Sequence, residues 1–562
     1  MIDTPSTGAI VNVAVHLKNS VARLPFKRAV VAPGRRDSAG RIPYTHLTFT
    51  QLDEESDRLA HGLKSVGIGK GTRTILMVTP SIDFFAITFA LFKTGAVPVV
   101  VDPGMGLKRM VNCFAESQPE AFIGIPKAHV LRTLYPKFFK SVTTWVTVGR
   151  RWFWGGLTLK QIRAAQWQPF AMAPTRKDDM AAILFTTGST GPAKGTIYTH
   201  GNFDAQIRHI QAHFEIADDE IDLPTFPLFA LFDPALGMTA VIPDMDPTRP
   251  AQVDPEKIIE PIRNHGVTNM FASPALLNRV GKYGKENGIA LPSLRRVVSA
   301  GAPVSPANIE QFSAMLSGDA EVHTPYGATE AVPIISIGSR EILAETRKKS
   351  EQGFGMCVGR ALDGVDVDII RITDDPITRW SEDLAVPGGE IGEIVVRGAH
   401  VTRGYYRHPK ADALSKIRDD DGGFWHRMGD LGWRDTKGRV WFCGRKSHRV
   451  ETAVETLYTI PCEAVFNNHA AVFRSALVGV GRPPAQIPVI CIEVDPAHGK
   501  IDKESLADEL LDRARDNPLT RNIRDVLFHP AFPVDIRHNS KIFREQLSAW
   551  AEGKIGTKGG EK

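Results

Sequence analysis

The segment that most constrains this chain is FTTGSTGPAKG, residues 185–195. An apolar run at 181–185 precedes it and predicts a buried strand. The loop after that strand gathers hydroxyls, glycines and one lysine, so that backbone N–H groups and a fixed positive charge meet at one point. It lacks the Gly-Lys-Ser/Thr spacing of a Walker loop. We therefore predict a different phosphate-binding loop, made by Thr186, Thr187, Gly188, Ser189, Thr190, Gly191 and Lys194.

Strand and helix patterns alternate along the chain, which predicts an α/β fold with mainly parallel strands. After the loop, Asn202 is the expected N-cap of a helix that places Phe203, Ile207, Ile210 and Phe214 on one face. A second unit has a strand at 294–299, then a helix capped by Ser305, with Pro306 first and a stripe of Ile309, Phe312 and Leu316. Residues 371–389 predict a loop or hairpin, and residues 553–562 a frayed tail. Loops at strand ends are the expected ligand site.

Composition narrows the class of protein. A chain of 562 residues with 43% hydrophobic and 23% charged residues is typical of a globular protein of two or more domains. A net charge of +5 is small for this length, so nothing favours a nucleic-acid partner. Five scattered cysteines without metal spacing suit a reducing compartment. We see no signal peptide, and the most apolar stretch, 84–101, is too short and broken to span a membrane, so we expect a cytoplasmic protein.

Further motifs follow in order. They are SAGAPVS at 299–305, YGATE at 326–330, EIVVRGAHVTRGYY at 393–406, RMGDLG at 427–432, Gly444-Arg445, and NSKI at 539–542. The chemistry of YGATE is readable. Tyr326 offers an aromatic face to a purine, Gly327 allows close approach, and Thr329 and Glu330 can hold Mg²⁺ near phosphates.

Taken together, these segments resemble the adenylate-forming superfamily of acyl-CoA synthetases, luciferases and peptide-synthetase adenylation domains. The resemblance spans residues 47–550 and implies an AMP-forming ligase that uses ATP and Mg²⁺. It also implies a large AMP-binding domain at 1–444, of mainly parallel sheets wrapped by helices. A small mobile α/β lid would follow at 445–562, with His448 at the hinge.

The resemblance assigns roles to individual residues. Lys541 would enter the site for adenylation and stabilise the transition state at the α-phosphate. Thr329 and Glu330 would assist catalysis, with Glu330 as the metal ligand and Lys194 on the leaving pyrophosphate. Gly301 and Ala302 would border the adenine together with Tyr326 and Gly327. Asp430 and Arg445 would hold the ribose.

The hinge departs from the acyl-CoA synthetase pattern. Glu451 stands where a lysine is common, and Val454 where a glycine is common. A β-branched side chain at Val454 should obstruct the path of a pantetheine thiol. Asn539-Ser540 also replaces the usual Ser-Gly. Neutral drift in a working CoA ligase remains the alternative explanation.

The expected acyl pocket lies in residues 227–250. Its apolar side chains favour an alkyl substrate. Asp233 sits much as the amine-binding aspartate of amino-acid-activating domains does, but it could also cap a loop or contact a substrate hydroxyl. The predicted pocket residues are Phe229, Leu231, Phe232, Asp233, Leu236 and Met238.

The pocket and the hinge together resemble the β-lactone synthetases of bacterial olefin biosynthesis. This implies adenylation of a long-chain 2-alkyl-3-hydroxy acid, after which the β-hydroxyl displaces AMP without CoA. It also implies that the chain assembles with other olefin-pathway enzymes. The main alternative is a long-chain fatty-acyl-CoA ligase. An amino-acid adenylation enzyme and a non-catalytic nucleotide-binding module also remain. His448 and Asp233 are candidate bases for the hydroxyl proton, and the absence of any dedicated base is equally open.

Overall fold

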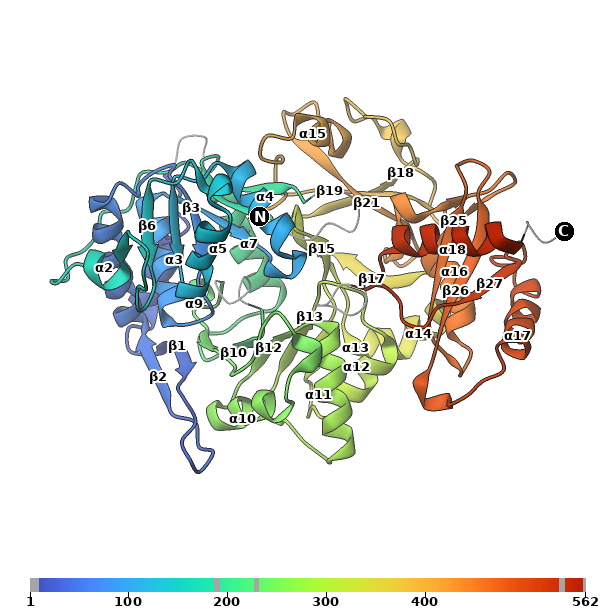
Figure 1. Cartoon of the computed structure of the whole chain (residues 1–562), viewed down its shortest axis with the longest axis horizontal. Helices are drawn as coiled ribbons and strands as arrows, with labels where there is room; N and C mark the ends of the chain where they lie inside the picture. The colour runs from blue at the N-terminus through green and yellow to red at the C-terminus, as the bar shows by residue number, and fades with distance from the viewer. Residues whose placement is uncertain (1–9, 186–192, 227–231, 535–540, 559–562) are drawn as a thin grey trace.

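The computed structural model describes residues 10–185, 193–226, 232–534 and 541–558, and the phosphate-loop segment 186–192 lies outside these ranges. Two mainly parallel sheets form the first half of the chain (Figure 1). The first has the order β7-β6-β5-β3-β4-β8-β9 and is parallel except for β9. Its strands are β3 (Arg73–Met77), β4 (Val97–Val101), β5 (Ala121–Gly124), β6 (Thr144–Thr147), β7 (Leu157–Thr158), β8 (Met180–Phe185) and β9 (Gly195–Thr199).

The second sheet has the order β14-β13-β12-β10-β11-β1-β2, and only β2 is antiparallel to its neighbour. Its strands are β1 (Arg28–Pro33), β2 (Tyr44–Thr48), β10 (Ile221–Pro224), β11 (Thr239–Val241), β12 (Asn269–Ala272), β13 (Arg296–Ser299) and β14 (Glu321–His323). The helices of this half are α1 (Val15–Arg23), α2 (Phe49–Ser65), α3 (Ile82–Thr94), α4 (Leu107–Ser117), α5 (Pro126–Leu134), α6 (Leu159–Ile162), α7 (His200–His213), α9 (Phe232–Leu236), α10 (Glu256–His265), α11 (Pro274–Glu286) and α12 (Pro306–Ser313).

The largest core cluster lies between these two sheets. Helix α3 is buried at every residue from Phe84 to Thr94 and packs on α2. The same cluster takes in Val30 of β1, Leu76 of β3 and Ala240 of β11. A helix that is buried on every side in this way belongs in the interior. Helix α3 is therefore the central layer that joins the two sheets.

A third, antiparallel sheet follows, which the strand–helix alternation did not predict. Its order is β15-β16-β17-β22-β21-β19-β18, with β20 paired to β21. The strands are β15 (Tyr326–Ala328), β16 (Ala331–Ser336), β17 (Met356–Ala361), β18 (Asp366–Ile370), β19 (Gly392–Arg397), β20 (Lys416–Arg418), β21 (Phe424–Arg434) and β22 (Val440–Arg445). Short helices α13 (Ser339–Glu341), α14 (Arg347–Glu351) and α15 (Pro409–Ser415) accompany them. Residues 371–389 contain no strand, in agreement with the predicted loop.

The C-terminal part is small and lies at the right of Figure 1. A two-stranded ribbon of β23 (Val450–Glu451) and β24 (Thr456–Leu457) precedes a three-stranded sheet of β25 (Val472–Val480), β26 (Ile487–Val494) and β27 (Asp525–Phe528). Its helices are α16 (Thr459–Asn467), α17 (Lys503–Arg515) and α18 (Arg544–Lys558). The domain boundary at 444–448 stays a prediction. It coincides with the end of β22 and a 3-10 turn, Lys446–His448.

Several local predictions need correction. Thr199, not Asn202, caps α7, and Asn202 is the third helical residue, whose side chain accepts a hydrogen bond from the Thr199 N–H at 3.0 Å. Such a reciprocal capping box places both polar residues at one helix start. Helix α12 ends before Leu316, and α18 continues to Lys558 rather than fraying from Gly553.

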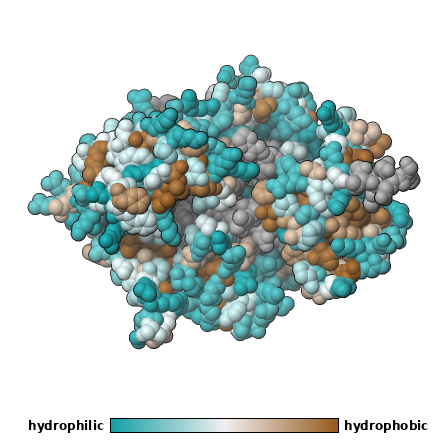
Figure 2. All heavy atoms as spheres, viewed as in Figure 1, coloured by the Kyte–Doolittle hydropathy of each residue, from teal (hydrophilic) through white to brown (hydrophobic). Residues whose placement is uncertain are grey.

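The face shown in Figure 2 is mainly hydrophilic, with apolar residues gathered over the first sheet and the C-terminal part. All five cysteines are buried and free. Among the described helices, none is both long and apolar enough to cross a bilayer.

Candidate active site

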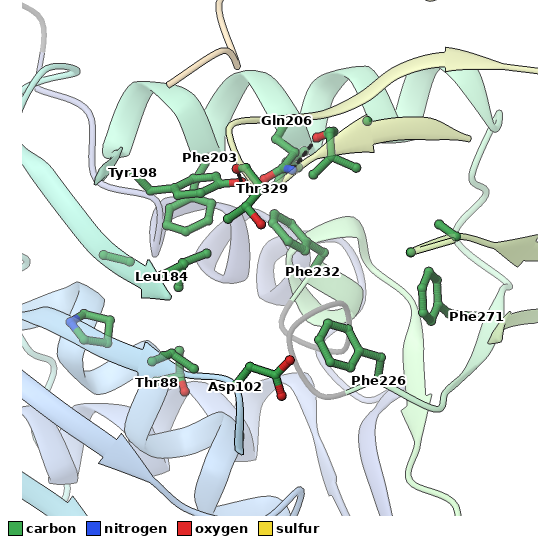
Figure 3. A pocket seen from close by; sticks show the side chains of 18 of the residues that line it. Thr88, Asp102, Leu184, Tyr198, Phe203, Gln206, Phe226, Phe232, Phe271 and Thr329 are labelled. Carbon is green, nitrogen blue, oxygen red and sulfur yellow. Dashed lines mark hydrogen bonds between the residues drawn. The ribbon is translucent and has the colours of Figure 1, made fainter. Parts of the chain in front are cut away.

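A cavity of about 250 Å³ opens at the carboxyl ends of strands from both parallel sheets. Asp102 follows β4, Thr225 and Phe226 follow β10, and Ser273 follows β12. Ligands bind at this edge in open α/β sheets because the loops there are free to vary. The wall is largely apolar and includes Phe89 and Phe92 of α3, Leu184 of β8, Phe203 and Ile207 of α7, and Phe232 and Phe271 (Figure 3).

At one end of the site Tyr405 lies between two predicted residues, Lys194 and Glu330. Lys194 lies at the start of β9 with its Nζ 5.1 Å from the centre of the Tyr405 ring. The Tyr405 hydroxyl donates a 2.6 Å hydrogen bond to Glu330 Oε1. Burial and the charge of Glu330 raise the pKa of Tyr405, so its hydroxyl remains a donor. Tyr405 lies in the motif at 393–406, but its place in the sequence indicates no role for it.

Lys416 is a second site residue that the sequence did not predict. Its Nζ donates to the carbonyl of Thr402, whose own N–H donates to the carbonyl of Glu330. Burial lowers the pKa of Lys416 to about 7, against the opposing effect of the Glu330 and Asp412 carboxylates. No local pattern distinguishes this lysine from a surface one, because only the fold brings it beside Glu330.

The predicted ribose-binding residues are assembled as one network. Asp430 of β21 and Arg445 of β22 are register partners, and Arg445 Nη1 donates to Asp430 Oδ1 at 2.8 Å. The Tyr326 hydroxyl donates to the other carboxylate oxygen, Oδ2, at 2.7 Å. Each carboxylate oxygen can accept a further hydrogen bond. Asp430 is therefore held in place with acceptor capacity left for a ligand hydroxyl.

Two glycines bring the backbone to the cavity wall. Gly301 adopts φ +97, a conformation that disfavours other residues, and Gly327 lies nearby in the lining. A Cβ on Gly327 would stand 2.6 Å from the carbonyl oxygen of Ala331, so a side chain there would clash. Ala302 follows Gly301 but does not belong to the lining.

Thr329 and Lys541 line the same cavity from opposite ends of the sequence. The Thr329 carbonyl accepts a hydrogen bond from the Tyr198 hydroxyl. Lys541 belongs to the C-terminal part, and it faces a cavity that the first two sheets build. The predicted motif residues Asn539 and Ser540 lie outside the described ranges.

The predicted acyl pocket is only partly correct. Phe232 lines the cavity, whereas Leu236 and Met238 are buried in the core cluster and are absent from the lining. Apolar residues next to a site can serve the core instead, and their sequence pattern is the same. Phe229 and Leu231 fall outside the described ranges. Other elements also supply apolar wall residues that the sequence did not predict for the pocket, among them Phe89 and Phe92 of α3 and Phe203 and Ile207 of α7.

Asp233 faces Asp222 of β10 rather than the cavity. Both carboxyl groups are buried, and the Asn269 amide donates to Asp222 Oδ1. Burial raises the pKa of both aspartates, and the negative charge of Asp222 raises that of Asp233 further. Asp233 is buried beside Asp222 and is absent from the cavity lining, so its position does not support a contact with the substrate.

The hinge residues also lie away from the cavity. His448 Nε2 is 3.2 Å from Glu545 Oε1, and the histidine is not part of the cavity lining. The suggestion that His448 accepts the hydroxyl proton is therefore not supported by its position. Val454 is 79% exposed, so its side chain blocks no passage in the arrangement seen here.

Two polar residues of the cavity wall, Asp102 and Gln206, were not predicted from the sequence. Asp102 is the one carboxylate among the described lining residues, and its Oδ1 accepts a 2.9 Å hydrogen bond from the Gly104 N–H. Gln206 of α7 is buried and donates its amide to the Val332 carbonyl. Its Oε1 accepts no hydrogen bond within the described residues. Buried acceptors of this kind are seldom left without a partner in native proteins.

The residues present fit a magnesium ion. No group of three metal-binding side chains occurs in the described part of the chain. Magnesium needs no such cage, because one or two carboxylates and the substrate phosphates complete its shell. Glu330 beside Thr329 suits that arrangement.

The AMP-binding enzyme family profile matches residues 17–406. The chain therefore belongs to the AMP-binding enzyme family, and it is an AMP-forming ligase. Within that family its near relatives are olefin beta-lactone synthetases. It is 48% identical to the one from Stenotrophomonas maltophilia, over 97% of this chain and 98% of the relative. It is 45% identical to the one from Xanthomonas campestris pv. campestris, over 98% of this chain and 99% of the relative.

Solved structures share the fold at low identity. An amide bond synthetase from Marinactinospora thermotolerans superposes with a TM-score of 0.77 and 21% identity, covering 96% of this chain and 99% of that one. O-succinylbenzoate coenzyme A synthetase from Bacillus subtilis, in complex with AMP, gives 0.73 and 18% over 95% and 97%. These matches support the architecture of a large N-terminal and a smaller C-terminal part.

Proposed function

We propose that this protein is an ATP-dependent olefin β-lactone synthetase acting on a long-chain 2-alkyl-3-hydroxy acid. In the first step a carboxylate oxygen attacks the α-phosphorus of ATP and pyrophosphate leaves. In the second the β-hydroxyl oxygen attacks the acyl carbon, loses its proton, and AMP leaves. The product is a four-membered lactone, and the tethered nucleophile favours ring closure over attack by an external thiol.

The observation that carries this proposal is the polarity of the cavity. Aromatic and aliphatic side chains of its wall suit an alkyl chain, yet the wall also contains the Asp102 carboxylate and the Gln206 oxygen, which accepts no hydrogen bond from any described residue. In Figure 3 these two side chains border the cavity from opposite sides. A plain fatty acid offers neither group a partner at its alkyl chain. A 3-hydroxy acid offers one hydrogen-bond donor beside its carboxyl group.

We assign the two groups different tasks. In the bound substrate the β-hydroxyl donates its single hydrogen bond to Gln206 Oε1, which positions it, and the hydroxyl turns to Asp102 when the oxygen attacks. Asp102 takes the hydroxyl proton when the oxygen attacks, as a general base. The apolar wall keeps water from the acyl-adenylate, which would otherwise hydrolyse.

For adenylation we assign the residues as follows, and their positions in the site support the assignment. Lys541 stabilises the negative charge that develops at the α-phosphate, and Lys194 binds the departing pyrophosphate. Asp430 accepts hydrogen bonds from the ribose while Arg445 and Tyr326 hold its carboxylate. Glu330 and Thr329 would hold Mg²⁺, which would neutralise phosphate charge when bound. The substrate and product are expected to pass between this chain and other enzymes of olefin biosynthesis.

A CoA-free turnover assay tests the proposal. The enzyme is mixed with Mg²⁺, ATP and a long-chain 2-alkyl-3-hydroxy acid, and AMP and the organic product are followed by mass spectrometry and NMR. Repeated AMP release with a β-lactone product is expected. A thioester formed only after CoA is added would make the chain a fatty-acyl-CoA ligase. ATP binding without turnover in either assay would make it a non-catalytic module.

A further inference from the structure

Positive charge is concentrated in one stretch of this chain. Between Glu120 and Asp178 there is no acidic residue, whereas ten residues are lysine or arginine. The stretch carries more positive charge than the net +5 of the whole chain, so the remainder is net negative. A segregated charge of this kind indicates a surface that meets an anionic partner.

The fold gathers part of this stretch into one surface. Helix α5, the 3-10 helix Pro136–Phe139 and the loop 149–156 make up what we term the α5 surface. Arg132 of α5 donates its Nη2 to the Gly155 carbonyl at 2.6 Å. Trp154 of the loop stacks on His129 of α5 at a ring distance of 5.4 Å. The loop is therefore fixed against the helix.

Apolar side chains stand out from this surface. Buried Trp154 anchors the loop, while its neighbours Trp152 and Phe153 are 52% and 76% exposed. Leu134, at the end of α5, is 63% exposed. In Figure 2 apolar residues gather over the region where Figure 1 places α5. Exposing several large apolar side chains side by side to water is unfavourable in free energy, and a partner that covers them would remove this penalty.

The basic side chains around these residues keep their charge uncompensated. Lys127, Lys137, Lys140, Arg150 and Arg151 are exposed, and none forms an ion pair with any described residue. By contrast Arg163, in the same acid-free stretch, pairs with Glu55. The α5 surface thus combines free cations with protruding aromatic and aliphatic groups.

We propose that the α5 surface docks this enzyme on an anionic phospholipid bilayer. Tryptophan and phenylalanine insert at the level of the lipid headgroups, while lysine and arginine are attracted to anionic lipids. The protruding side chains favour a bilayer over a nucleic acid, since they flank one loop tip rather than line a groove for stacked bases. Docking does not depend on the proposed chemistry, although a lipid-like substrate would then be drawn from the same bilayer.

Vesicle flotation with the full chain tests this surface. We expect binding to vesicles of phosphatidylglycerol and phosphatidylcholine, weak binding to phosphatidylcholine alone, and release as salt rises. The double variants Trp152→Ser/Phe153→Ser and Arg150→Ala/Arg151→Ala should each lose roughly tenfold or more of the bound fraction. Phe26→Ser and Arg41→Ala, exposed residues outside this surface, serve as matched controls and should bind as the unchanged protein does.

Three results would overturn the inference. They are equal binding to both kinds of vesicle, binding that neither double variant weakens, and no binding to either vesicle by enzyme that turns over detergent-dispersed substrate. In all variants the melting temperature should stay within a few degrees of that of the original protein. Turnover in detergent should stay within about twofold of the original. These readouts separate a failure of docking from a failure of folding or of the proposed reaction.

Discussion

At the scale of single residues, we propose that Asp102 and Gln206 serve the second half of the reaction. Asp102 lies at the end of β4, where asparagine can replace it and still accept the Gly104 N–H. Gln206 has a buried oxygen that no described group satisfies. Both residues line the cavity, whereas Asp430 lies in β21 and is held by Tyr326 and Arg445. The two half-reactions should therefore respond separately to substitution.

We predict that Asp102→Asn leaves ATP–pyrophosphate exchange within a few fold of the original. Lactone formation should fall roughly 100-fold, because the amide cannot take the hydroxyl proton. Gln206→Leu should raise the apparent KM for the hydroxy acid and leave exchange driven by a non-hydroxylated acid intact. Asp319→Asn, at a fully exposed site, is the control. Ring closure at the original rate in Asp102→Asn would remove Asp102 from the mechanism.

At the scale of elements, the contact between β10 and α9 predicts a dependence of stability on pH. Burial holds the pKa of Asp222 and Asp233 above that of an aspartate in the unfolded chain, about 4. The folded protein thus keeps a proton that the unfolded chain releases. This contribution is complete below about pH 4 and is lost as pH rises through the raised pKa values.

Asp233→Asn should reduce the loss of stability with rising pH, because the asparagine amide can face Asp222 without taking up a proton. Each pH unit in this window changes the free energy of unfolding by at most about 1.4 kcal/mol per group. Melting temperatures from pH 4 to neutrality, compared between Asp233→Asn, the original protein and Asp319→Asn, provide the measurement. Parallel curves for all three would show that the pair is ionised in the fold.

The sequence predicted the helices, the strands and the motif residues better than it predicted which residues line the cavity. Tyr326, Asp430 and Arg445 lie in motifs whose spacing marks them, and the fold brings them together. A lone Asp102 after a strand has no such spacing. The choice between core and cavity for Leu236 depends on what packs beside it, which a local pattern does not encode. The same limit hid Tyr405 and Lys416, whose partner Glu330 is distant in sequence.

At the scale of the whole molecule, the cavity lining includes residues of the two parallel sheets together with one residue of the C-terminal part. Strands of the two parallel sheets form the wall, and Lys541 reaches it from the C-terminal part. The proposed ribose contacts use Asp430 and Arg445, which lie on β21 and β22, whereas Lys541 lies in the C-terminal part. Binding and activation of ATP should therefore be separable.

Lys541→Ala should reduce adenylate formation roughly 100-fold, the usual effect of removing one preorganised charge at a developing anion. ATP affinity should change little, because the ribose and adenine contacts remain. ATP–pyrophosphate exchange and calorimetric binding measure the two quantities. Lys500→Ala, an exposed lysine of the same part, is the control. Exchange at the original rate in Lys541→Ala would mean that another group supplies the charge.

Helix α3 has a consequence for how substrate range can change. Phe89 and Phe92 form part of the cavity wall and also belong to the core that joins the two parallel sheets. Enlarging the pocket there would leave a void in the core between the two sheets, so altered chain-length preference would come with lost stability. Phe226 and Pro247 line the cavity without membership of that core. Divergence toward longer or bulkier acids should accumulate at such positions while the helix stays unchanged.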